Sequence, residues 1–289
     1  MNKKAYLTSA EGTDNLFLSL AQYYPIQQRT DIYIEMKKNL TLLILNSVTL
    51  VFALVMNYLS GTTVFGSKNV GEISDMLPNL FTPAGYAFAI WGLIYLMLVA
   101  FVINLWVSWY REKENTTLLQ IGFLFSLANM ANGFWVFAWL NLYIGFSVVL
   151  MLVILGSLIA LTFRLQLETG DTPKRIIALV WWPITIYLGW IIVATVANIT
   201  ALLVSLGWNG GSFEPLTWTI VMIVIATLIY LLLIYLRNMP ETALVGIWAL
   251  IAIAVKQWSQ QPGIVWAALI ASAVLFIVIV MRAITRFKK

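Results

Sequence analysis

The side chains inside this chain that could do chemistry are amides and aromatic rings rather than charges. Asn129, Asn132, Trp135 and Trp139 follow one another at helical spacings of three or four residues, so a helix places them on one face. Such a face is typical of ligand pockets, which are mostly apolar and aromatic with a few placed polar groups. It is also typical of plain helix packing, because Asn side chains often hydrogen-bond between membrane helices.

Two further faces repeat this combination of residue types. Trp91 and Tyr95 lie one helical turn apart. A later apolar segment places four residues on one face by the same spacing: Tyr187, Trp190, Ala194 and Asn198. Three such faces favour a shared pocket over packing alone.

Several classes of chemistry are excluded by what the chain lacks. It has no His and no Cys, which removes zinc sites, thiol nucleophiles, disulfides and the usual axial ligand of haem. No Asp, Glu or Arg stands in the middle of an apolar segment. This argues against a carboxylate-driven pump and against acid–base catalysis within the membrane. We therefore expect no catalytic residue, no metal and no cofactor.

Composition identifies the elements that must position these side chains. Of the 289 residues, 61% are apolar and 10% are charged, whereas soluble domains carry about 25% charged residues. The chain is therefore expected to be an integral membrane protein. Eight segments approach the roughly 20 apolar residues of a membrane-crossing helix. They are 39–59, 86–109, 117–139, 142–163, 176–206, 216–236, 241–257 and 263–284.

Basic residues predict the orientation of these segments. If the N-terminus is inside, all but Lys68 and Lys256 of the 17 Lys and Arg residues fall in the inside segments. This bias follows the positive-inside rule and predicts that both termini are cytoplasmic. No basic patch of the kind that binds nucleic acid is present, so nucleic acid is not an expected partner.

The longest connection, residues 60–85, leads into the stretch "FTPAGYAFAIWGLIY" at 81–95. With Asn132-Gly-Phe-Trp135 and "YLGWIIVATVAN" at 187–198, this stretch resembles the TspO/translocator protein family, also called tryptophan-rich sensory proteins. The three motifs occur in the family's order. Ala84 and Tyr86 depart from its pattern, in which proline and tryptophan are usual.

The resemblance implies an all-α fold in which residues 39–208 form a TspO-like five-helix bundle. A polar extension at 1–38 precedes it, and residues 209–289 add three transmembrane helices that the family's core fold lacks. The family binds tetrapyrroles and other flat hydrophobic molecules near a mouth closed by the first loop. The motifs and helical faces give the expected ligand-binding residues: Phe81, Pro83, Trp91, Tyr95, Asn132, Trp135, Trp139, Tyr187, Trp190, Ala194 and Asn198.

The function that these observations favour is a membrane ligand-binding protein that senses, carries or regulates a tetrapyrrole or lipid-like molecule. A transporter of such ligands and a light-dependent porphyrin-modifying enzyme are the alternatives. A retinal protein built on Lys256 is a further one, although snorkelling at a helix end explains this lysine more simply. Membrane lipid and a second copy of the chain, as a homodimer, are the other expected partners. The expected location is a bacterial inner membrane.

Overall fold

The computed structural model of the chain describes residues 26–77, 79–112, 116–167, 172–208, 211 and 213–287. Within these ranges the chain forms helices and no strand. The helices are α2 (Ile26–Leu59), α3 (Val70–Met76), the 3₁₀ helix η1 (Gly85–Ala89), α4 (Ile90–Glu112), α5 (Thr116–Ile121), α6 (Leu124–Leu140), α7 (Ile144–Arg164), α8 (Lys174–Ile176), the π-helical turn η2 (Ile177–Trp181), α9 (Trp182–Ser205), α10 (Pro215–Arg237), α11 (Pro240–Gln257) and α12 (Pro262–Phe287).

Most of these helices have the length and composition of membrane spans. In the described part of the chain, seven helical segments are long and apolar enough to cross a membrane, and α6 is a shorter apolar helix of 17 residues. A span needs about 17–25 residues, so α6 lies at the lower limit. All eight expected apolar segments are therefore helical, and the protein is an all-α integral membrane protein.

Two expected boundaries differ from the structure. The first described helix, α2, runs from Ile26, so residues 26–38 of the expected polar extension are part of it, whereas residues 1–25 lie outside the described residues. Hydropathy marks the part of a helix that can sit in lipid and not the point where the helix begins, because polar residues continue a helix into water.

The segment expected as one span at 117–139 is divided into α5 and α6. Gly122 lies between them with φ +54°, a left-handed conformation that glycine adopts at little cost. Its N–H donates to Leu118 O at 3.0 Å and closes α5. The sequence does not reveal this break, because glycine is also frequent inside membrane helices.

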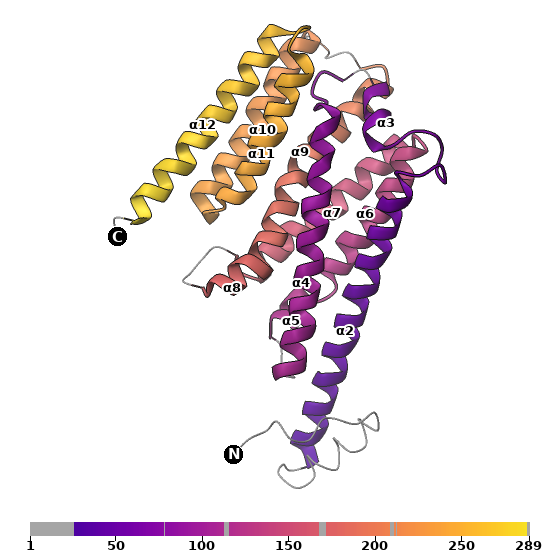
Figure 1. Cartoon of the computed structure of the whole chain (residues 1–289), viewed down its shortest axis with the longest axis vertical. Helices are drawn as coiled ribbons and strands as arrows, with labels where there is room; N and C mark the ends of the chain where they lie inside the picture. Colours follow the sequence, from indigo (N-terminus) through magenta and orange to yellow (C-terminus); the bar gives the residue numbers. More distant parts are fainter. Residues whose placement is uncertain are drawn as a thin grey trace.

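The helices form two groups that meet at α9. The five-helix bundle consists of α2, α4, α6, α7 and α9, and the C-terminal unit consists of α10, α11 and α12 (Figure 1). α9 packs against α7 on one side and against α11 on the other. The connection between α2 and α4 carries α3 and η1 across one end of the bundle (Figure 1). We call its described residues, 60–77 and 79–89, the lid.

Candidate functional site

The lid is held in shape by the helix at its centre. A helix as short as α3 is unstable alone, but Asn69 Oδ1 accepts hydrogen bonds from Gly71 N and Glu72 N at 2.9 and 3.0 Å. Glu72 Oε2 accepts in turn from Asn69 N at 2.7 Å, which completes a capping box. Val70, Ile73 and Ser74 are buried. The lid therefore places a fixed, partly apolar surface over the bundle.

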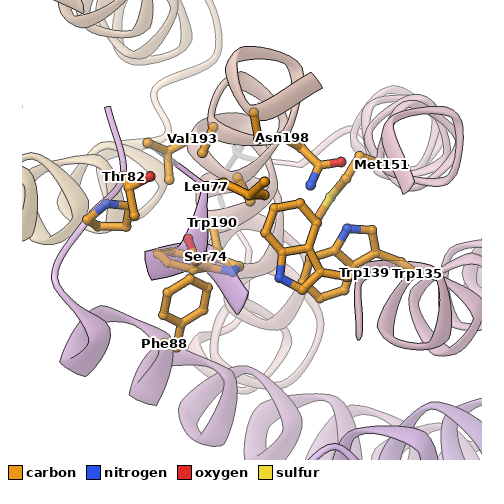
Figure 2. Close-up of a pocket in the computed structure, with 14 residues that line it drawn as sticks. Ser74, Leu77, Thr82, Phe88, Trp135, Trp139, Met151, Trp190, Val193 and Asn198 are labelled. Atoms are coloured by element: carbon orange, nitrogen blue, oxygen red, sulfur yellow. The ribbon is translucent and has the colours of Figure 1, made fainter. Parts of the chain in front are cut away.

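A cavity lies under the lid, between α6, α7 and α9 (Figure 2). Its empty space is about 510 Å³, including the open part of its mouth. The lining residues are Ser74, Leu77, Thr82, Pro83, Phe88, Trp135, Trp139, Met151, Trp190, Val193, Ala194, Ala197, Asn198 and Ala201.

Aromatic rings form much of the cavity wall. Trp135 and Trp139 of α6 are stacked, with ring centroids 5.9 Å apart and planes 19° apart. The ring of Phe88 meets that of Trp190 edge to face at 5.8 Å. Figure 2 shows the two α6 indoles together on one side of the cavity and Phe88 beside Trp190 on another. These arrangements present ring faces and edges to any molecule in the cavity.

Small residues on α9 leave the space that the aromatic rings border. Ala194, Ala197 and Ala201 recur at helical spacing on the face that lines the cavity. Asn198 stands among them, and its Oδ1 accepts a hydrogen bond from Ser147 Oγ of α7 at 2.8 Å. That bond fixes the orientation of the amide. The wall formed by α9 is thus mostly apolar, with one oriented amide.

A second layer of aromatic residues lies against the cavity wall. Its centre is Trp91 of α4, whose ring stacks on Tyr95 at 5.4 Å, as the one-turn spacing predicts. The ring of Trp91 also meets those of Tyr187, Trp135 and Trp190 at 5.8, 6.2 and 6.3 Å. Helices α4, α6 and α9 therefore converge through their aromatic residues.

Aromatic side chains of the cavity wall and of the second layer carry hydrogen-bond donors without partners among the described residues. The indole N–H groups of Trp91, Trp135 and Trp190 and the hydroxyl of Tyr187 have no hydrogen-bond partner among the described residues. Each of these side chains is at most 7% exposed. A buried polar group without a partner costs about 1–3 kcal/mol. Of the four, Trp135 and Trp190 line the cavity, so the cavity is suited to a partner that carries hydrogen-bond acceptors.

The eleven residues expected from the sequence fall into two sets. Six of them line the cavity: Pro83, Trp135, Trp139, Trp190, Ala194 and Asn198. Of the others, Phe81 is fully buried in the core, and Trp91, Tyr95 and Tyr187 belong to the second layer. Asn132 Oδ1 accepts from Asn57 Nδ2 and from Tyr95 Oη, both at 2.9 Å. These five support the cavity wall and do not form it.

Some lining residues were not expected from the sequence. Phe88 lies three residues before Trp91, so helical spacing could have identified it. Ser74, Leu77 and Thr82 belong to the lid, whose length indicates a role but does not say which residues face inward. Met151 is an apolar residue in an apolar helix, and no sequence pattern distinguishes it from its neighbours.

Comparison with known proteins places the chain in a family. A family model described as TSPO-like protein matches residues 43–281. The matched range begins in α2 and ends in α12, so it includes the C-terminal helices that the sequence motifs do not reach. No curated protein and no solved structure matches the chain. Because the match covers well over half of the 289 residues, the chain belongs to the TSPO-like protein family.

Proposed function

We propose that this protein binds a flat, hydrophobic, acceptor-bearing molecule of the tetrapyrrole class in the cavity under the lid, and acts as its sensor, carrier or regulator. The observation that carries this proposal is the cavity itself, bordered by stacked indoles, small α9 residues and buried indole N–H donors without partners. Each aromatic contact with a macrocycle contributes about 0.5–1.5 kcal/mol beyond the burial of area. Pyrrole nitrogens, carbonyls or carboxylates would supply acceptors.

The size of the cavity sets a condition on this function. Only about 30 Å³ of the cavity can be reached by the centre of a water molecule, whereas ligand pockets usually enclose about 300–1,000 Å³. A macrocycle therefore fits only after the lid or the lining side chains move. Binding is expected to be slow compared with diffusion, because it waits for this opening.

The test is a titration of the purified full-length protein with protoporphyrin IX, followed by the shift of the porphyrin absorbance band. Ala194→Phe fills the cavity from α9 and is expected to weaken binding about tenfold or more, since overpacking costs about 1–3 kcal/mol. Trp135→Phe keeps a ring in the wall but removes an N–H donor, and is expected to weaken binding several-fold.

The matched control is Trp266→Phe, the same chemical change on a side chain of α12 that is 66% exposed. Its affinity is expected to equal that of the unmodified protein. Equal affinities for the unmodified protein and all three variants would contradict binding in this cavity. Comparing illuminated and dark samples separates binding from light-dependent modification, because only modification changes the porphyrin spectrum with time.

A further inference from the structure

Helix α11 of the C-terminal unit borders the second half of the lid and contacts it at four places. Trp248 Nε1 donates to Ala87 O at 3.2 Å, and Ala84 N donates to Ala252 O at 3.0 Å. Further along, Gln257 Nε2 donates to Leu80 O at 3.1 Å, and Lys256 forms an ion pair with Asp75. We call this set the latch. Its α11 members are Trp248, Ala252, Lys256 and Gln257; its lid members are Ala87, Ala84, Asp75 and Leu80.

The latch has a regular geometry. Trp248, Ala252 and Lys256 are four residues apart, so they lie along one face of α11. The lid runs in the opposite direction past this face, because the partners of Trp248, Ala252 and Lys256 are Ala87, Ala84 and Asp75 in turn. The ring of Tyr86 adds an edge-to-face contact with Trp248, with centroids 5.3 Å apart. The second half of the lid is thus fastened along the C-terminal half of α11.

The fastened part of the lid is also a wall of the cavity. Thr82, Pro83 and Phe88 line the cavity and lie between or beside the latch contacts. The bundle also holds the lid, through Trp139 Nε1 donating to Val70 O at 3.1 Å and Asn79 Nδ2, next to Leu80, donating to Ala197 O at 3.2 Å. Release of this part of the lid would therefore change the wall of the cavity.

The ion pair is the part of the latch most open to water. The side chains of Lys256 and Asp75 are 33% and 47% exposed. Exposed ion pairs are weak and are screened by salt. Separation of the two charges by water therefore costs little, whereas the hydrogen bonds that Trp248 and Gln257 donate to the lid are partly buried.

We propose that α11 latches the lid over the cavity, and that separation of Lys256 from Asp75 is the first step of its opening. The proposal rests on the proposed function for what enters the cavity, but lid opening itself is measurable without a ligand. Through this latch, the C-terminal unit sets how often the cavity is open.

The chain has no cysteine, so a single introduced thiol reports on the lid. Ser74→Cys places this thiol on α3, where Ser74 lines the cavity and is 7% exposed. Alkylation by a water-soluble maleimide then requires opening of the lid. Ser67→Cys, on an exposed part of the lid, is the matched control.

Adding Lys256→Met or Asp75→Asn to Ser74→Cys is expected to raise the alkylation rate about two- to fivefold, the factor that a partly exposed ion pair supplies. The charge-reversed pair, Asp75→Lys with Lys256→Asp, is expected to restore the parent rate. Raising the salt concentration should speed alkylation of the Ser74→Cys parent but not of its Lys256→Met derivative. The Ser67→Cys rate should not change in any background.

An unchanged Ser74→Cys rate in both single-charge variants would overturn the latch, as would an equal rise at Ser67→Cys. Association of protoporphyrin IX, followed by stopped flow, is expected to accelerate by the same factor in Lys256→Met. If alkylation responds but no variant binds the porphyrin, the latch stands and the proposed ligand is wrong. If the porphyrin binds but neither its association rate nor the alkylation rate changes, the latch is wrong and the proposed ligand stands.

Discussion

The five-helix bundle and the C-terminal unit differ in whether their buried polar side chains have hydrogen-bond partners. In the bundle, Trp91, Trp135, Trp190 and Tyr187 keep a donor without a partner among the described residues. Both polar atoms of the Asn129 amide are unpartnered as well, although this side chain is 1% exposed. Of these residues, Trp135 and Trp190 line the cavity, and Trp91 and Tyr187 lie in the second layer behind them.

In the C-terminal unit the central polar side chains are paired. Tyr230 Oη donates to Gly189 O of α9 at 2.8 Å, and Thr242 Oγ1 donates to Thr185 O of α9 at 3.1 Å. Thr227 hydrogen-bonds within its own helix. Unpartnered atoms in this unit lie near helix ends, on Trp218, Arg237, Gln257 and Arg282.

This difference indicates that the C-terminal unit supports the bundle, whereas the bundle carries the candidate site. Hydrocarbon offers no water to a polar group, so membrane helices are stable when such groups find partners inside the protein. The C-terminal unit follows this rule where it packs on α9. The bundle departs from it beside the cavity under the lid, where several donors have no partner among the described residues, and again at the buried amide of Asn39 in α2. Violations of this kind are expected at functional sites.

The largest expected effect comes from disturbing the contact between the five-helix bundle and the C-terminal unit. A Cβ atom on Gly189 would lie 2.8 Å from Thr242 O and 2.9 Å from Val245 Cβ. Gly189→Leu therefore forces α11 away from α9 and is expected to lower the free energy of unfolding by about 3 kcal/mol. Unfolding in mixed micelles, followed by near-ultraviolet circular dichroism, measures this loss.

Gly156→Leu on α7 is the control, because nothing lies within 4 Å of a Cβ at that position. Its stability is expected to match or exceed that of the unmodified protein, since leucine favours the helix more than glycine does. A similar loss in both variants would mean that the close contact at Gly189 is not what joins the C-terminal unit to the bundle.

The fold and the candidate site could be predicted from the sequence only in part. Apolar length identified the eight helical segments, and spacing placed Trp135 with Trp139 and Trp190 with Ala194 on shared faces. These predictions succeed because helical periodicity is local: it depends on residues three or four apart. The sequence did not predict the division of the third segment at Gly122, because the conformation of a glycine is set by the packing around it.

Long-range contacts could not be predicted from the sequence for a different reason. The sequence expects Lys256 at a helix end, and the structure confirms this place, but Asp75 lies far away in the chain. No spacing rule joins two such residues. The expected site residues show the same limit: Trp91 and Trp190 are aromatic residues on helical faces, yet only Trp190 lines the cavity. Which ring faces the space depends on how helices cross.

A second prediction compares two amides one turn apart on α6. Asn132 accepts two hydrogen bonds, whereas Asn129 has no partner among the described residues. Asn132→Leu removes the acceptor of Tyr95 Oη and leaves Asn57 Nδ2 with its bond to Ala53 O alone, and is expected to cost about 1–3 kcal/mol of stability. Asn129→Leu removes no hydrogen bond and is expected to be neutral. The same unfolding measurement applies, and an equal cost at Asn129 would show that this amide is paired in the native protein.

The smallest expected effect gives the most direct test, because it uses one chemical change in both parts of the molecule. Tyr230 and Tyr187 are both fully buried, but only Tyr230 has a partner for its hydroxyl among the described residues. Tyr230→Phe is expected to cost about 0.6–1.5 kcal/mol, the contribution of one buried hydrogen bond. Tyr187→Phe removes an unpaired hydroxyl and is expected to leave stability unchanged or slightly raised. If Tyr187→Phe destabilised the protein as much as Tyr230→Phe, the bundle would be as fully paired as the C-terminal unit, and its unpaired donors would no longer mark a binding site.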